Sequence, residues 1–250
     1  MPLAAELATT ALSDDPERAS GAFAEDALLA YWDGVGEETA PRALAHGPDQ
    51  IRAALADGAF GGGRPEILVR LEGGANCLLE GRLTWETGDR LETFAASLQR
   101  DRTGAVTRCL LYRTPLVEPS RTWGENDRGS GDARAVLDAY FEHLGRGRFE
   151  EAANCFSEDC LYSHPPYARG AGRAEFRGRA ELLAGFVRRG YKSYEYTFAI
   201  TLQSGPDCMI EGTASGTTLG GSFLSSLSLD GDGRIHRYAA FYCEPPVPRR

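Results

Sequence analysis

The residue best suited to chemistry is a histidine at the end of a short predicted strand. The stretch from Asp159 to Pro166 reads Asp-Cys-Leu-Tyr-Ser-His-Pro-Pro, and its two prolines end the strand directly after His164. Histidine titrates near neutral pH, so it can accept and return a proton in enolisation, cyclisation or elimination. We expect His164 to act as a general base beside a mostly apolar pocket. The alternative is a histidine that only hydrogen-bonds to the following loop.

Other polar residues are weaker candidates for a site. The loop after His164 is rich in arginine, and this group either binds a carboxylate or phosphate or lies in solvent: Arg169, Arg173, Arg177 and Arg179. His236, near the start of the last predicted strand, is more typical of a solvated turn. The four histidines show no ligand spacing with cysteines or carboxylates, and no glycine-rich phosphate loop follows a strand. We therefore expect neither a metal nor a nucleotide cofactor.

Composition narrows the class of protein. The 250 residues carry a net charge of −9, which does not favour a nucleic-acid-binding face. The six cysteines form no Cys-x-x-Cys pair, which is typical of buried thiols in a reducing compartment. The N-terminus lacks the basic and apolar segments of a signal peptide, and no apolar run reaches the roughly 18 residues of a membrane span. We expect a soluble, cytoplasmic protein that acts on a small molecule, without nucleic-acid or membrane partners.

The chain contains an internal repeat. The motif 76–81, Asn-Cys-Leu-Leu-Glu-Gly, matches 207–212, Asp-Cys-Met-Ile-Glu-Gly, with Cys77 and Cys208 lying 131 positions apart. Residues 94–101 match 223–230 at an offset of 129. These matches predict two copies of one domain, residues 1–117 and 133–250, joined by the polar, turn-rich linker 118–132. Glu80 and Glu211 recur at the same place in both copies, which favours a structural ion pair over catalysis.

Each copy is predicted to contain three helices and five strands. In the second copy Asp132 caps a helix whose apolar face carries Val136, Leu137, Tyr140, Phe141 and Leu144. The later elements are a helix 149–156, the strand ending at His164, a loop 167–177, a helix 179–188 and strands 194–202, 208–217, 222–229 and 235–243. The first copy has helices 6–12, 16–23 and 48–56 and strands 27–32, 66–71, 77–87, 91–100 and 106–115. This order predicts an α+β fold with helices on one side of a curved antiparallel sheet.

This order of elements resembles the NTF2-like superfamily of cone-shaped α+β domains, which includes ketosteroid isomerases and SnoaL-like polyketide cyclases. The motifs that carry the resemblance are Tyr140-Phe141-Glu142, Phe156-Ser157-Glu158-Asp159 and Asp230-x-x-Gly233-Arg234-Ile235. The resemblance covers both copies and implies two tandem NTF2-like domains. Domains of this family usually dimerise through their sheets. We therefore expect the two copies to pair within one chain as a pseudo-dimer, with a homodimer left open as a further state.

The resemblance also implies positions for site residues. Ketosteroid isomerases carry a catalytic tyrosine on the first helix, an aspartate that acts as general base at the end of the first strand, and a protonated aspartate on a later strand. In the second copy these positions fall on Tyr140, His164 and Ser225. Tyr140 is therefore expected to donate a hydrogen bond to an oxyanion. The overlay points further residues into the cone as substrate contacts: Tyr162, Phe223, Ser225, Tyr238 and Tyr242. In the first copy the three positions fall on Leu7, Tyr31 and Ala96, so we expect a degenerate pocket there.

The sequence leaves several functions open. We expect a cofactor-independent isomerase, cyclase or lyase that acts on a small, largely apolar metabolite, of the kind found in polyketide-like secondary metabolism. Because only the tyrosine of the isomerase pattern is kept, steroid isomerisation itself is not expected. The alternative is a non-catalytic ligand-binding or scaffold protein. An epoxide hydrolase of the limonene-epoxide type ranks lower, because its Asp-Arg-Asp set is not located in the sequence.

Overall fold

A computed structural model describes residues 15–33, 43–56, 63–86, 91–115, 129–164, 174–216 and 221–243. The chain divides into two compact units, residues 1–120 and 121–250, and each is described by itself. The expected helix 6–12 and most of the expected linker lie outside the described residues. Within the described part of the chain, no helix combines the length and the apolarity that crossing a membrane requires.

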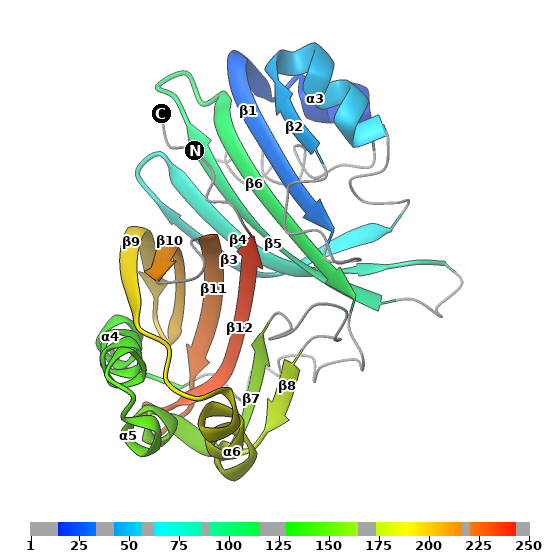
Figure 1. Cartoon of the computed structure of the whole chain (residues 1–250). Helices are drawn as coiled ribbons and strands as arrows, with labels where there is room; N and C mark the ends of the chain where they lie inside the picture. Colours follow the sequence, from blue (N-terminus) through cyan, green and yellow to red (C-terminus); the bar gives the residue numbers. More distant parts are fainter. Residues whose placement is uncertain are drawn as a thin grey trace. The chain divides into compact units, whose positions relative to one another are not determined.

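The first unit is a six-stranded sheet with two described helices (Figure 1). Its elements are α2 (Pro16–Ser20), β1 (Phe23–Asp33), β2 (Ala43–His46), α3 (Gly47–Ala56), β3 (Arg64–Gly73), β4 (Asn76–Thr84), β5 (Leu91–Arg100) and β6 (Val106–Pro115). The strands lie in the order β2-β1-β6-β5-β4-β3. Asp15 caps α2 by accepting from the backbone N–H groups of Glu17 and Arg18.

The second unit is a six-stranded sheet with three helices. Its elements are α4 (Ala133–Gly145), α5 (Phe149–Asn154), β7 (Phe156–His164), β8 (Ala174–Arg177), α6 (Arg179–Arg189), β9 (Tyr194–Ser204), β10 (Asp207–Gly216), β11 (Gly221–Leu229) and β12 (Ile235–Cys243). The strand order β8-β7-β12-β11-β10-β9 is that of the first unit, so the repeat in sequence is a repeat in structure. Asp132 caps α4 as predicted, because its side chain accepts from the N–H of Ala135.

Both sheets are open and share one pairing pattern. Neighbouring strands are antiparallel, except that β1 pairs parallel with β6 and β7 pairs parallel with β12. The strands β2 and β8 were not expected, and β8 corrects the predicted loop 167–177 at its C-terminal end. Each is four residues long and pairs along the outer edge of β1 or β7, so it carries little strand signal in sequence.

The helices cover one face of the second sheet. In Figure 1, α4, α5 and α6 lie together on one side of it, and α4 contacts β9, β10 and β11 while α6 contacts β7 and β8. The apolar core between these layers is strongly aromatic, with Tyr140, Phe156 and Phe186 fully buried. Alternation of side chains along each strand therefore decides which residues enter this core.

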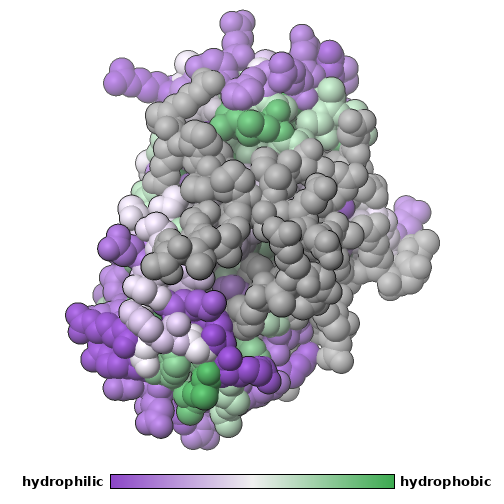
Figure 2. Space-filling view, viewed as in Figure 1, coloured by the Kyte–Doolittle hydropathy of each residue, from purple (hydrophilic) through white to green (hydrophobic). Residues whose placement is uncertain are grey.

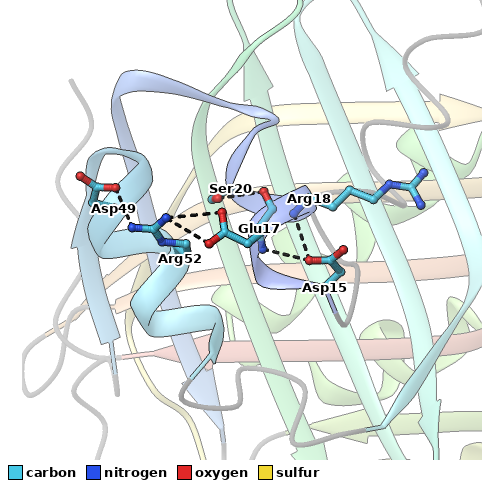
Figure 3. A network of polar contacts seen from close by, with 6 residues as sticks. All are labelled: Asp15, Glu17, Arg18, Ser20, Asp49 and Arg52. Carbon is cyan, nitrogen blue, oxygen red and sulfur yellow. Dashed lines mark hydrogen bonds and ion pairs between the residues drawn. The ribbon is translucent and has the colours of Figure 1, made fainter.

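On the face shown in Figure 2, the described residues are mostly hydrophilic. Large exposed apolar side chains are few among the described residues: Leu44, Val187 and Tyr191. In the first unit a network of exposed charges joins α2 and α3 (Figure 3). Arg52 lies 3.1 Å from Glu17 and 3.0 Å from Asp49. Exposed pairs of this kind contribute about 0–1 kcal/mol each, so we assign this network a minor structural role.

Candidate functional site

Three strands of the second unit direct their side chains toward the helices at one corner of the sheet. The register pairs Tyr238 of β12 with Tyr162 of β7, and Ser225 of β11 with Ala240 of β12. Because side chains alternate, His164 lies on the same face as Tyr162, two residues further along β7. The first helix of the unit, α4, adds Tyr140 to this corner.

Four side chains form what we call the tyrosine cluster, namely Tyr140, Tyr162, Ser225 and Tyr238. The hydroxyls of Tyr140 and Tyr162 lie 3.3 Å apart, and those of Ser225 and Tyr238 lie 2.9 Å apart. The rings of Tyr162 and Tyr238 are stacked, with centroids 5.0 Å apart and planes 13° apart. All four residues are at most 3% exposed. The cluster thus holds two pairs of hydroxyl groups enclosed by aromatic rings.

Apolar rings pack against the ring of Tyr140. Phe156 meets the Tyr140 ring edge-on at 5.2 Å, and Phe186 lies roughly parallel to it at 6.2 Å. Burial raises the pKa of the Tyr140 phenol well above its usual value, the neighbouring Tyr238 raises it further, and the hydrogen bond with Tyr162 opposes both. Tyr140 is therefore a neutral phenol at physiological pH and is suited to donating a hydrogen bond.

His164 lies at the more accessible end of this arrangement. It is partly buried, and its ring is parallel to that of Tyr162, with centroids 6.1 Å apart and planes 2° apart. Tyr162 thus links the two residues predicted to do chemistry, since its hydroxyl contacts Tyr140 and its ring faces His164. The prolines that follow His164 lie outside the described residues.

The other predicted substrate contacts divide between two places. Phe223 is buried in a neighbouring aromatic group, where its ring lies 6.1 Å from Phe141 and 6.0 Å from Tyr196. Tyr242 is partly buried and packs against the same core. The structure therefore brings Tyr162, Ser225 and Tyr238 together with Tyr140, and places Phe223 beside this cluster rather than within it.

The weaker candidates lie elsewhere. Arg169 and Arg173 are outside the described residues, and Arg179 forms an ion pair with Glu158 at 2.9 Å. The ring nitrogen Nδ1 of His236 lies 3.4 Å from the hydroxyl of Ser157 and 3.5 Å from a carboxylate oxygen of Asp159. A serine–histidine–acid relay uses opposite nitrogens of the imidazole, so this trio does not form one.

One buried charged group was missed in the sequence. In the first unit Arg113 of β6 and Glu92 of β5 form an ion pair of 2.7 Å, and both side chains are at most 5% exposed. Alternation could have found it, because Arg113 shares a face with Leu111, and Glu92 shares a face with Phe94. Glu80 and Glu211 are buried as a structural role requires, and their expected ion pairs stay a prediction.

Comparison with known proteins finds a family model that matches most of the second unit. Residues 137–242 match the model of the SnoaL-like domain. Similar solved structures include a Kribbella flavida DSM 17836 protein provisionally assigned as a ketosteroid isomerase, with 23% identity, a TM-score of 0.38 and coverage of 47% of this chain and 82% of that one.

Two further solved structures illustrate the range of similar proteins. An NTF-2 like protein of unknown function from Burkholderia xenovorans LB400 is 15% identical, with a TM-score of 0.39 and coverage of 47% and 87%. An LEH-like epoxide hydrolase from M. tuberculosis is 18% identical, with a TM-score of 0.36 and coverage of 45% and 84%. No curated protein matches the chain. The expected resemblance to SnoaL-like domains is confirmed for the second unit by the match of residues 137–242, and the first unit has the same strand order.

Proposed function

We propose that the second unit, a SnoaL-like domain, is a cofactor-independent enzyme for isomerisation, cyclisation or elimination of a small, largely apolar metabolite. The observation that carries the proposal is the tyrosine cluster, in which the buried hydroxyls of Tyr140 and Tyr162 meet and the ring of Tyr162 stacks on that of His164. Hydroxyls inside an aromatic core can stabilise an oxyanion more strongly than water-exposed ones, because the local dielectric constant is low. A metabolite of polyketide type, with its enolisable carbonyl groups and apolar rings, suits this environment.

The roles follow from position. His164 removes a proton from the carbon next to a substrate carbonyl, and the electron pair moves to the carbonyl oxygen. Tyr140 donates a hydrogen bond to that oxygen, which takes the place of the Tyr162 hydroxyl as the partner of Tyr140. The enolate then collapses in one of three ways. It regains the proton from His164 at another carbon, attacks a second carbonyl, or expels a leaving group.

A second candidate function is non-catalytic ligand binding or a scaffold role. It is favoured by the nearly complete burial of Tyr140, Tyr162 and Tyr238, because a core that is already filled needs no substrate. Epoxide hydrolysis ranks below both, since the tyrosine cluster contains neither an acid nor an arginine. Turnover by the protein with its tyrosine cluster intact would support the enzyme, and absence of turnover would support the scaffold role.

The test compares the wild type with His164→Ala on small aromatic and polyketide-like enols. Binding is followed by thermal shift and NMR, and turnover by chromatography of the products. We expect both proteins to bind the same compounds and only the wild type to convert them. His236→Ala is the matched control, because this histidine of the same unit contacts Ser157 and Asp159 instead of the cluster. Full turnover by His164→Ala, or no stabilisation of the wild type by any compound, would contradict the proposal.

A further inference from the structure

Three side chains of the second unit form a set of parallel rings that includes His164. The rings of Tyr238 and Tyr162 have centroids 5.0 Å apart and planes 13° apart, and those of Tyr162 and His164 have centroids 6.1 Å apart and planes 2° apart. Tyr238 and Tyr162 are register partners on the parallel strands β12 and β7, and His164 follows on the same face of β7. Rings at these separations are in contact, so the position of one ring restricts that of the next.

Ser225 holds the inner end of this set of rings. Its hydroxyl lies 2.9 Å from that of Tyr238, and both residues are at most 3% exposed. Burying a hydroxyl without a hydrogen bond costs about 1–3 kcal/mol, so a Tyr238 ring that turned away would take this partner from Ser225 at that cost. The contacts therefore run from Ser225 through the two tyrosine rings to His164.

The strand on the other side of β7 also holds the middle ring. On β8, the register partner of Tyr162 is Phe176, and their rings pack with centroids 5.9 Å apart. The register partner of His164 on β8 is Ala174, whose methyl group is too short to fix the plane of an imidazole. Tyr162 is thus held from both neighbouring strands and offers His164 a fixed surface.

The first unit builds the same part of its sheet without these groups. The positions that correspond to Tyr162, Ser225 and Tyr238 carry buried residues with neither a ring nor a hydroxyl group: Leu29, Ala96 and Cys109. The fold can therefore be built without two tyrosines and a serine at these positions. The difference between the copies accompanies His164, whose counterpart in the first unit is Tyr31.

We propose that Tyr162, Tyr238 and Ser225 are positioning residues, which hold the imidazole of His164 in a single orientation toward the substrate. The inference rests on the function proposed for the second unit, because orientation matters to catalysis only if His164 moves a proton. A general base acts within hydrogen-bond reach of that proton, and a misplacement of about 1 Å can slow a reaction about 100-fold. The sequence predicts that these three residues contact the substrate, and the proposal gives them a role through His164 instead.

NMR of the His164 side chain in the full chain, without substrate, tests the orientation. Three-bond couplings about χ1 distinguish a single rotamer from an average over several. We expect one rotamer in the wild type and in Tyr162→Phe, which keeps the ring, and averaging in Tyr162→Leu, which introduces the leucine of the first unit. His236 is the internal reference, because it contacts Ser157 and Asp159. Averaged couplings in the wild type, or a single rotamer in Tyr162→Leu, would overturn the proposal.

A smaller change covers the case in which Tyr162→Leu does not fold. Ser225→Ala removes only the hydroxyl that bonds to Tyr238, and it should also give averaged couplings at His164. Ser226→Ala is the matched control, since this neighbouring serine lies on the opposite face of β11 and the substitution should leave the couplings unchanged. Equal couplings in the two alanine variants would overturn the proposal.

Steady-state kinetics on a compound that the wild type converts separate positioning from substrate contact. Tyr162→Leu and Ser225→Ala should lower kcat about tenfold or more with KM unchanged, because the base is misplaced while substrate binding is kept. Tyr162→Phe should recover most of that loss. A raised KM with unchanged kcat would make these residues substrate contacts and overturn the proposal. If no compound is converted, the proposed function fails, and the couplings still decide whether His164 is held in one orientation.

Discussion

Tyr140 combines the properties of a core residue and of a hydrogen-bond donor. Its hydroxyl meets that of Tyr162 at 3.3 Å inside an aromatic shell. We predict that Tyr140→Phe lowers the free energy of unfolding by about 1 kcal/mol, because the hydroxyl of Tyr162 loses this partner. If Tyr140 stabilises an oxyanion, the same substitution lowers kcat by about 100-fold or more. Urea unfolding and single-turnover assays measure the two effects separately, and an unchanged kcat would remove Tyr140 from the mechanism.

Because several thiols are buried, the stability of the fold depends on pH in the alkaline range. Burial raises the pKa of Cys109 and Cys208 to about 12 and that of Cys77 and Cys160 to about 11, from 9.0. Above pH 9 the unfolded chain loses these protons while the folded chain keeps them. The stabilisation is therefore complete below pH 9 and is lost as the pH rises toward 11–12.

We predict that the free energy of unfolding falls between pH 9.0 and about pH 11, with each thiol contributing up to about 1.4 kcal/mol per pH unit. Urea unfolding at several pH values measures the slope. Cys109→Ala should make it shallower, because one of the shifted groups is gone. A slope that is unchanged in this variant would show that Cys109 ionises equally in both states.

At the scale of single elements, the motif shared by residues 76–81 and 207–212 ends in a glycine for which the structure gives a reason. Gly81 on β4 and Gly212 on β10 each lie beside a register shift in the partner strand. A Cβ at Gly212 would lie 2.6 Å from the carbonyl oxygen of Thr197 and 2.8 Å from the ring of Phe223. At Gly81 the same clash arises with Glu66 and Phe94. The glycine therefore lets the ring lie flat on a bulged pair of strands.

We predict that Gly212→Ala destabilises the second unit by about 1–3 kcal/mol, because the backbone oxygen of Thr197 cannot move away as a side chain would. Gly231→Ala is the matched control, since a Cβ there meets nothing within 4 Å and the backbone does not adopt a positive φ. Thermal or urea unfolding of both variants is the measurement. Equal stability of the two would show that the strands relax around the added methyl group.

Sequence patterns predicted the long elements better than the short ones. Strands 91–100, 106–115 and 235–243 have the expected bounds, because apolar and β-branched residues fill them and turn residues flank them. The strand that ends at His164 begins at Phe156, earlier than expected, because α5 ends at Asn154. The four-residue strands β2 and β8 are held by pairing with a neighbour, which no local pattern reports.

The candidate site was predictable only as far as the family resemblance reached. The overlay placed Tyr140, Tyr162, Ser225 and Tyr238 in one region, and the structure brings these four side chains together in the tyrosine cluster. The overlay did not predict the ion pair of Arg113 and Glu92, because the family pattern has no charged residue at these positions. Two residues on adjacent strands, 21 positions apart in the sequence, become neighbours only once the register is known.

At the scale of the whole molecule, each sheet has an apolar face turned away from its core. Phe223 and Tyr242 face the core of the second unit, so their neighbours Leu224 and Phe241 point to the opposite face. In the first unit Leu110 and Tyr112 lie opposite to Leu111 in the same way. Apolar faces of this kind are unfavourable in water and are normally covered.

The pseudo-dimer therefore stays our prediction for the whole chain. If one chain carries both copies of a pairing domain, no second chain is needed, and light scattering should give a mass near 27.1 kDa at micromolar concentration. Leu224→Glu, which puts a charge on the face opposite the core, should lower the free energy of unfolding by several kcal/mol without changing the mass. A mass of twice that value, lost in Leu224→Glu, would instead make this face the contact between two chains. A tolerated Leu224→Glu would show that the face is open to solvent.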